Sequence, residues 1–273
     1  MTPQDGLALQ RDLDHLQCWS ARWGLVLNPV KCKTLTVTLR RAPVRTTYHI
    51  NGTPLEIVNE MRDLGVVIDS KLNFASHVSR VVRQANRALG LLIRSFQTGT
   101  RGAKFNQKTL LVTYFANVRS ILEYSCVIWA GAAKTHTERA DRVQHKFLLW
   151  LNRHTTVSCP SLSYNSLLNH FGIPSLSARR VQYDLLFLRN VFSGKINSAD
   201  LVAQFSLHVP PRSTRSQRLF AEHPWRVCAI RDGFLRRTPK VMNVFLSVSG
   251  ADLFNDDFST FRCRVMRYVR SLT

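Results

Sequence analysis

The chain has 273 residues, with 38 Lys and Arg against 17 Asp and Glu, a net charge of +21 at pH 7, and 45% apolar residues. The apolar content excludes a wholly disordered chain. The excess of positive charges favours a polyanionic partner, because like charges repel one another in a compact fold. No run approaches the roughly 20 consecutive apolar residues of a membrane-spanning helix, and the N-terminus has no secretory signal. We therefore expect an intracellular protein, nuclear or cytoplasmic, that is not secreted, enters no membrane and binds nucleic acid.

The first 72 residues predict one helix followed by a small antiparallel sheet. Residues 7–23 carry apolar side chains at helical spacing, and Gly24 is placed to end this helix; the apolar positions are Leu9, Leu13, Leu16 and Trp23. Residues 34–39 alternate Thr with Leu or Val, as a half-buried strand does. Residues 48–50 lead into Asn51-Gly52, the favoured hairpin turn, and the chain returns at 55–58. Residues 64–68 predict a further strand.

From residue 75 the pattern becomes helical, and the segment 75–96 is the clearest. At 100° per residue its apolar side chains fall on one side, whereas four arginines fall on the opposite side: Arg80, Arg83, Arg87 and Arg94. Further helices are expected at 107–124 and 138–152, the latter with Val143, Phe147, Trp150 and Leu151 inward. Between residues 75 and 154 there are 13 Lys or Arg against 3 acidic residues, a net +10.

The rest of the chain has a mixed pattern. Helices are predicted at 160–172, 175–193 and 256–271, whereas 205–250 is predicted to be rich in loops because of Pro210, Pro211, Pro224 and Pro239. The fold class expected from these elements is α+β and mostly α. Its parts are residues 1–72 with the sheet, a helical region at 73–155, and a basic region of helices and loops at 156–273.

Neither a metal site nor a nucleophilic active site is predicted. The six cysteines, at positions 18, 32, 126, 159, 228 and 263, form no C-x-x-C pair and are expected to be reduced thiols. His77, His136 and His145 are expected at the surface or at helix ends. Trp129 and Trp150 have apolar neighbours and are expected in the core, while Trp225 beside Pro224 is left open.

Several motifs, in a fixed order, resemble the reverse transcriptases of jockey-like non-LTR retrotransposons. The run LQRDLDHLQCWSARWGLVLNPVKCKTLTV resembles the segment after that family's catalytic strand pair. It is followed by the hairpin YHINGTPLEIV and by the segment DLGVVID at 63–69. RSILEYSCVIWAGA and the run ADRVQHKFLLWL resemble the family's thumb and post-thumb region. The resemblance covers most of residues 7–155.

By this resemblance, residues 1–72 are the C-terminal part of the palm, 73–155 the thumb and 156–273 a C-terminal region. Lys31 matches a lysine near the family's nucleotide site, although a solvated turn residue is the plainer interpretation. The family's metal-binding aspartates are expected upstream of Gln10, so no catalytic residue and no cofactor is predicted here, whereas the complete polymerase would require Mg²⁺. Phe254-Asn255-Asp256-Asp257 is rejected as a substitute, because it follows the thumb and has the composition of a helix start.

The predicted interface for a template-primer duplex of RNA or DNA consists of cations suited to phosphate contact: Arg80, Arg83, Arg87 and Arg94, with Arg139, Arg142 and Lys146 on the third helix. Glu138 and Asp141 are the alternative partners of the last three. The sequence thus favours part of a retrotransposon RNA-directed DNA polymerase that binds template and primer and is inactive alone. The alternatives are a non-enzymatic nucleic-acid-binding protein derived from a mobile element and a pseudogene product without a selected role.

Overall fold

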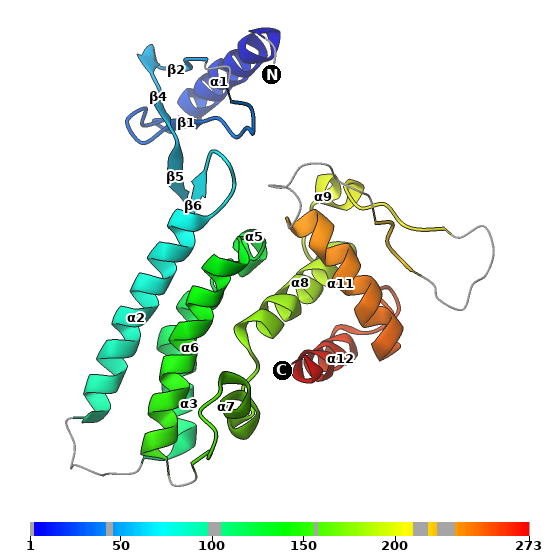
Figure 1. Ribbon diagram of the computed structural model, residues 1–273. Coiled ribbons are helices and arrows are strands. Elements are labelled where there is room, and N and C mark those ends of the chain that lie inside the picture. The colour runs from blue at the N-terminus through cyan, green and yellow to red at the C-terminus, as the bar shows by residue number, and fades with distance from the viewer. Residues whose placement is uncertain are drawn as a thin grey trace. The chain divides into compact units, whose positions relative to one another are not determined.

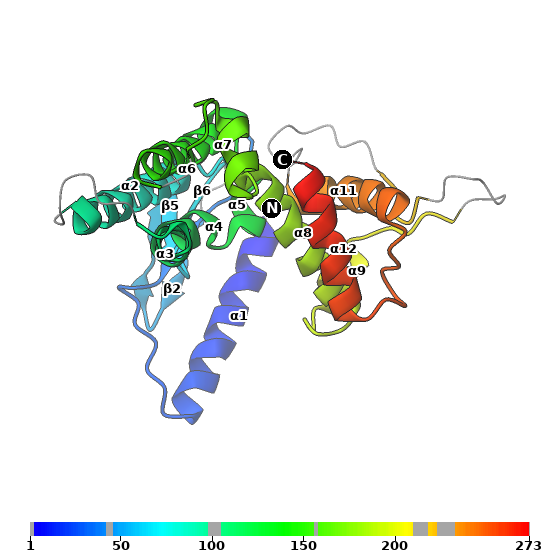
Figure 2. The ribbon, with the colours of Figure 1, turned by 90° about the horizontal axis from the view of Figure 1, so that it is seen from below.

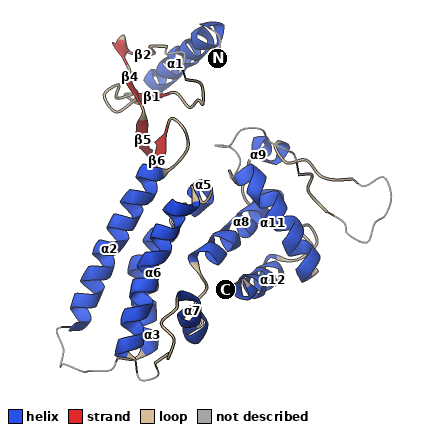
Figure 3. Cartoon of the chain, in the orientation of Figure 1, coloured by secondary structure: helices blue, strands red, loops and turns tan. Residues whose placement is uncertain are grey.

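The computed structural model describes residues 3–41, 46–97, 105–155, 158–209, 218–222 and 233–272. The chain divides into two units, Met1–His77 and Val78–Thr273. The strand pairs belong to the first unit and helices make up most of the second, as the colouring in Figure 3 shows. This confirms the predicted class, α+β and mostly α.

The first unit begins with helix α1 (Pro3–Arg22) and continues through three pairs of short strands. The strands are β1 (Lys33–Leu35), β2 (His49–Ile50), β3 (Thr53–Pro54), β4 (Glu56–Val58), β5 (Glu60–Asp63) and β6 (Val66–Asp69). The pairs β2–β3 and β5–β6 are antiparallel, whereas β1 pairs with β4 in parallel. The strand expected at 34–39 therefore ends already at Leu35. It pairs with a parallel strand, whereas an antiparallel partner was expected.

Two tight turns explain the sequence signals between these strands. Asn51 and Gly52 both have positive φ, 52° and 71°, as the predicted β2–β3 hairpin requires. Leu64 and Gly65 also have positive φ, 43° and 91°, and form the turn between β5 and β6. The prediction of a strand from residue 64 was wrong for these two positions, because Leu-Gly there reverses the chain.

The apolar face predicted for α1 is largely uncovered in the described part of the first unit. Leu13 packs against the small core of Tyr48, Ile50 and Leu55. Leu16 and Trp23, in contrast, remain 44% and 68% exposed. Polar side chains help to hold the helix: the Gln10 amide donates to the His49 carbonyl at 3.0 Å and accepts from the His49 N–H at 2.9 Å. The helix itself was predicted correctly, whereas most of its apolar face is exposed among the described residues.

The second unit starts with three long helical segments that lie side by side (Figures 1 and 2). Helix α2 (Ala75–Gln97) is followed by a continuous segment built of α3 (Gln107–Tyr114), the π-helical turn η1 (Phe115–Arg119) and α4 (Ser120–Glu123). The short α5 (Cys126–Trp129) leads into α6 (Lys134–His154). These segments confirm the helices predicted at 75–96, 107–124 and 138–152.

The remaining helices are α7 (Tyr164–Phe171), α8 (Leu176–Phe192), α9 (Ala199–Ala203), α11 (Phe234–Ser249) and α12 (Phe258–Ser271). Of these, α9, α11 and α12 contact α8, whereas α7 contacts α6. The α11 and α12 helices contact α8 and each other (Figure 1). Their shared core includes Leu185, Leu188, Phe245, Phe261 and Val265.

One loop prediction fails in this region. The segment 205–250 was expected to be rich in loops, yet α11 runs through Pro239, which is buried. Proline removes one backbone donor from a helix, but burial of neighbours such as Met242 and Phe245 outweighs that loss. Pro210, Pro211 and Pro224 lie outside the described residues.

Candidate nucleic-acid interface

The α2 helix separates an apolar side from an arginine side, as the sequence predicted. Its inner positions are buried, among them Val78 and Ala85 at 0% exposure. Arg83, Arg87 and Arg94 are exposed and Arg80 is half-buried. The α2 helix itself contains no acidic residue that could neutralise this row. These four cations can therefore reach a polyanion without first breaking an ion pair within their own helix.

A second basic row lies on α6. Arg139 donates from Nη1 to Ser79 Oγ of α2 at 2.9 Å, while Arg142 and Lys146 are exposed. The acidic residues considered as their local partners are engaged elsewhere. Glu138 pairs with Lys134 at 4.0 Å, and Asp141 lies 3.9 Å from Arg180 of α8. These contacts favour Arg142 and Lys146 as solvent-exposed cations over local pairing with Glu138 or Asp141.

The two helices that carry these rows are neighbours. The Ser79–Arg139 hydrogen bond joins the beginnings of α2 and α6, and the Phe96 and Trp150 rings, 6.2 Å apart, join their ends. Within α6, Arg139, Arg142 and Lys146 fall within about 60° of one another around the helix axis. The structure thus places all seven predicted cations on two helices that contact each other. Such a double row can neutralise several phosphates along one nucleic-acid backbone.

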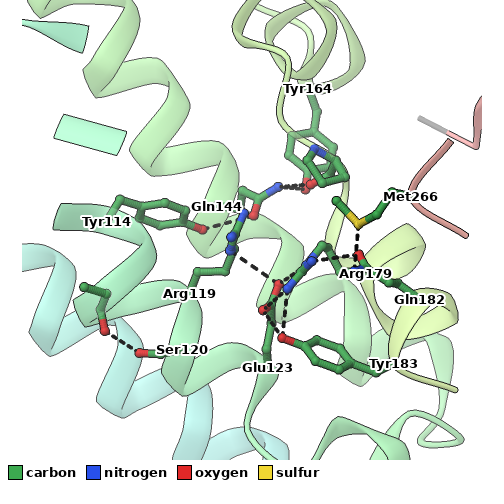
Figure 4. A network of polar contacts seen from close by, with 12 residues as sticks. Tyr114, Arg119, Ser120, Glu123, Gln144, Tyr164, Arg179, Gln182, Tyr183 and Met266 are labelled. Carbon is green, nitrogen blue, oxygen red and sulfur yellow. Dashed lines mark hydrogen bonds and ion pairs between the residues drawn. The ribbon is translucent and has the colours of Figure 1, made fainter. Parts of the chain in front are cut away.

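Behind these rows, a buried polar network joins α4 to α8 (Figure 4). Arg179 binds both carboxylate oxygens of Glu123, at 2.7 and 2.8 Å, and the Tyr183 hydroxyl donates to the same carboxylate at 2.8 Å. Burial would lower the pKa of Arg179, but its bonds to Glu123 outweigh burial and raise it. Arg119 lies 3.4 Å from Glu123, and burial lowers its pKa. These two arginines are therefore held as structural groups.

A second buried pair fastens α11 to α8. Arg237 donates to the two carboxylate oxygens of Asp184 at 2.7 and 2.9 Å, and it also donates to the Val127 carbonyl. Burial raises the pKa of Asp184, while the bonds from Arg237 oppose that rise. Sequence reasoning missed this pair because 53 residues separate its partners. The positive charge of Arg237 is thus neutralised inside the fold and is not available to a ligand.

The Phe254–Asp257 run is a helix cap, as expected from its composition. Asp257 is the N-cap of α12, and its carboxylate accepts from the backbone N–H groups of Ser259 and Thr260 at 2.9 and 3.1 Å. The hydrogen bonds from Ser259 and Thr260 lower the pKa of Asp257. Asp69 has a similar task before α2, where it accepts from the Phe74 N–H at 2.8 Å. The second aspartate of the DLGVVID motif therefore shapes a turn.

The aromatic and histidine predictions are mixed. Trp129 and Trp150 are buried, which confirms their place in the core. His77 lies in the first turn of α2, which agrees with the helix-end alternative, but it is only 1% exposed and its Nδ1 accepts from the Val67 N–H at 3.2 Å, so a surface placement was wrong for it. Trp225 lies outside the described residues.

Lys31 is exposed in the turn after α1, where its backbone N–H donates to the Asn28 carbonyl at 3.1 Å. This position is that of a solvated turn residue, and the role near a nucleotide site implied by the resemblance stays a prediction. Among the described residues, no group of three or more His, Cys, Asp or Glu is placed to hold a metal ion. None of the described helices combines the length and apolar character needed to cross a membrane.

Sequence reasoning also missed a second cationic surface, on α12. Arg262, Arg267 and Arg270 are exposed there, and Arg264 pairs with Asp256 at 3.1 Å. The signal was present in the sequence, since α12 contains four arginines and no acid. Apolar spacing identifies only the inward positions of such a helix and says nothing about its outer face.

The chain is similar to RNA-directed DNA polymerases of mobile elements, which confirms the resemblance identified from the motifs. It is 30% identical over 142 residues to a probable RNA-directed DNA polymerase from transposon BS of Drosophila melanogaster, covering 50% of this chain and 15% of the relative. It is 28% identical over 160 residues to the RNA-directed DNA polymerase from mobile element jockey of Drosophila funebris, covering 56% and 17%.

A probable RNA-directed DNA polymerase from transposon X-element of Drosophila melanogaster is 26% identical over 145 residues, covering 51% of this chain and 16% of the relative. The matched part is thus about a sixth of the length of these relatives. No family model matches the chain, and no solved structure matches it.

Proposed function

We propose that this chain supplies template-primer binding to an RNA-directed DNA polymerase of a mobile element, with the α2 and α6 cations in contact with the phosphates of an RNA or RNA/DNA duplex. The observation that carries the proposal is the double row of Arg80, Arg83, Arg87 and Arg94 beside Arg139, Arg142 and Lys146. The names of the relatives supply the class of substrate.

Charge supports a polyanion as the ligand. In the described part of the chain the buried arginines Arg179 and Arg237 already have carboxylate partners, whereas Arg83, Arg87 and Arg142 are exposed and form no ion pair there. Arginine forks bind phosphate oxygens in two-point geometry, so a row of them fits a repeating phosphate backbone. Because contacts to phosphates carry no sequence information, binding by this row should depend weakly on sequence.

The packing of α2 against α6 supports binding of the ligand by cations on a rigid surface. The α2 and α6 helices are held together at both ends, by Ser79–Arg139 and by Phe96–Trp150. Their inner faces are buried in a common helical body that includes Val143 and Phe147. The cations therefore extend from fixed helices. Binding a ligand costs them less conformational entropy than it would cost cations on a mobile loop.

The proposal is tested by binding of the purified chain to a fluorescent 20-base-pair RNA/DNA hybrid, followed by anisotropy at fixed salt. The variant R80Q/R83Q/R87Q/R94Q removes four positive charges from α2 and should weaken binding by more than about tenfold. R11Q/R22Q/R40Q/R41Q removes the same charge from exposed positions of the first unit and is the matched control. Equal losses in the two variants would contradict the proposal, because they would reflect net charge alone.

The α6 row is tested in the same assay. R142Q/K146Q should weaken binding of the hybrid, whereas the thermal unfolding of the variant should not change, since both side chains are exposed. An unchanged affinity would remove α6 from the proposed interface and leave α2 alone.

A further inference from the structure

The outer face of α12 combines arginines with apolar side chains around a hollow. The hollow has a volume of about 620 Å³, and its lining includes Phe258, Arg262, Cys263, Met266, Arg267 and Arg270. At about 100° per residue, Cys263, Arg267 and Arg270 point away from the buried Phe261, Val265 and Val269, whereas Phe258 and Arg262 lie at the border with that buried side. The face is therefore a solvent-side surface on a helix that is firmly fixed from behind.

The charge of this face is unbalanced. Arg262, Arg267 and Arg270 form no ion pair with an acidic residue in the part of the chain that the structure describes, and the Lys195 ammonium lies 4.0 Å from the centre of the Phe258 ring. Asp257, at the start of the helix, is occupied by capping the N–H groups of Ser259 and Thr260. An anionic ligand would thus meet three arginines and a lysine and no free carboxylate on α12.

The apolar members of the face are held in place. The Gln182 amide of α8 donates to Met266 Sδ, and Gln182 is itself bound by Arg179 at 2.7 Å (Figure 4). Phe258 is half-buried and is covered on one side by Lys195. Both side chains are therefore available as fixed contact points between the arginines.

We propose that this face of α12 binds single-stranded RNA or DNA, with phosphates on Arg262, Arg267 and Arg270 and with bases against Phe258 and Met266. A duplex offers mainly its sugar-phosphate backbone, whereas a single strand also presents base faces that gain from apolar contact. Cations alternate with apolar side chains in one hollow, and this combination suits a single strand better than a duplex.

This site is separate from the interface proposed on α2 and α6. The α8 helix contacts both α6 and α12 and so lies between the two surfaces. One surface could hold a duplex while the other holds an unpaired strand of the same nucleic acid. The inference goes beyond the proposed function and does not require it to be correct.

Cys263 provides a direct readout, because it is exposed in the middle of the face. The rate of its modification by N-ethylmaleimide, measured by peptide mass spectrometry, should fall several-fold when a uridine 20-mer saturates the intact chain. Cys18, exposed on α1 in the other unit, is the internal control and should react at an unchanged rate. Equal modification of Cys263 with and without the 20-mer would overturn the proposal.

Variants separate this site from the duplex interface. R262Q/R267Q/R270Q should abolish the protection of Cys263, whereas R80Q/R83Q/R87Q should keep it while duplex affinity falls. Retained protection in the first variant, with an unchanged thermal unfolding curve, would overturn the site. If duplex affinity does not fall in the second variant but protection by the 20-mer persists, the α2 proposal fails and the α12 proposal stands.

The nature of the ligand is tested by substituting the probe. Polyglutamate of matched charge should protect Cys263 less than the uridine 20-mer, because it has no base to contact Phe258 and Met266. A 20-base-pair duplex should also protect less at equal phosphate concentration. Equal protection by polyglutamate would mean a general acidic-polymer surface, and equal protection by the duplex would mean a phosphate-only site; either result contradicts the proposal.

Discussion

The two units of this chain differ in how they bury apolar side chains. In Val78–Thr273, large aromatic residues such as Trp129, Phe147 and Phe261 are fully buried. In Met1–His77, the core is a small cluster around Tyr48, Ile50 and Leu55, while Trp19 and Val26 are 54% and 90% exposed. Two-stranded pairs are marginal alone, so the first unit should contribute less to the stability of the chain than the second.

This difference indicates where stability and binding come from. Helices of the second unit are fixed by a continuous core and by buried ion pairs, and its cations therefore project from a rigid frame. The first unit keeps the motifs that resemble the back of a palm, but it exposes much of its apolar surface in the described residues. We expect the same kind of substitution to have very different effects in the two units.

The largest expected difference is in core truncation. Phe147→Ala should lower the free energy of unfolding by about 3–5 kcal/mol, because a buried ring stacked on Tyr114 at 3.9 Å is replaced by a cavity. Trp19→Ala, in the first unit, should change it by less than about 0.5 kcal/mol. Urea unfolding monitored by circular dichroism measures both. Similar losses would show that the first unit has a core of comparable strength.

The next effect concerns the network that joins α4 and α8. Glu123→Ala leaves Arg119 and Arg179 partly buried without their shared carboxylate, and it should cost about 3 kcal/mol or more in urea unfolding. Glu138→Ala is the matched control, since Glu138 has only an exposed partner at 4.0 Å, and it should cost less than about 1 kcal/mol. Equal costs would mean that the network contributes no more than a surface pair.

The exposed apolar face of α1 should govern solubility more than folding. Trp19→Ser combined with Trp23→Ser should raise the concentration at which the chain stays monomeric, because apolar patches on a surface promote association. Light scattering against protein concentration measures the change. Earlier aggregation of the double variant, or loss of helix signal, would show that this face is packed inside the protein.

The smallest effect is a dependence on pH. Burial raises the pKa of Asp141, and the Arg180 charge opposes that rise. A carboxyl group with a raised pKa binds its proton more readily in the folded chain, so its contribution to stability falls as pH rises through that range. The free energy of unfolding of the parent chain, relative to Asp141→Asn, should therefore decrease between about pH 4 and pH 7. An increase would contradict the buried placement of this carboxyl group.

Local patterns predicted the elements that are determined locally. The 75–96 helix was predicted because its apolar and arginine positions separate at helical spacing, and Asn51-Gly52 marked its hairpin because both residues adopt positive φ. The α2 arginines could be identified for the same reason. The cations on α6 were also predicted. The hydrogen bond between Arg139 and Ser79, which lies 60 residues away in sequence, was not.

Features set by distant contacts could not be predicted in this way. The parallel pairing of β1 with β4 and the Arg237–Asp184 pair depend on segments far apart in sequence. Pro239 predicts a loop, yet α11 continues through it because its neighbours are packed in the core. The exposure of the α1 face also depends on what covers it, which helical spacing cannot show.

The central claim is that the α2 arginines contact phosphates, and the salt dependence of hybrid binding tests it most directly. Each phosphate contact contributes about 0.9 to the slope of log affinity against log salt, so R80Q/R83Q/R87Q/R94Q should lower the slope by about 3 to 4. The control R11Q/R22Q/R40Q/R41Q should leave the slope close to that of the parent chain. Identical slopes for the parent and the α2 variant would contradict the claim.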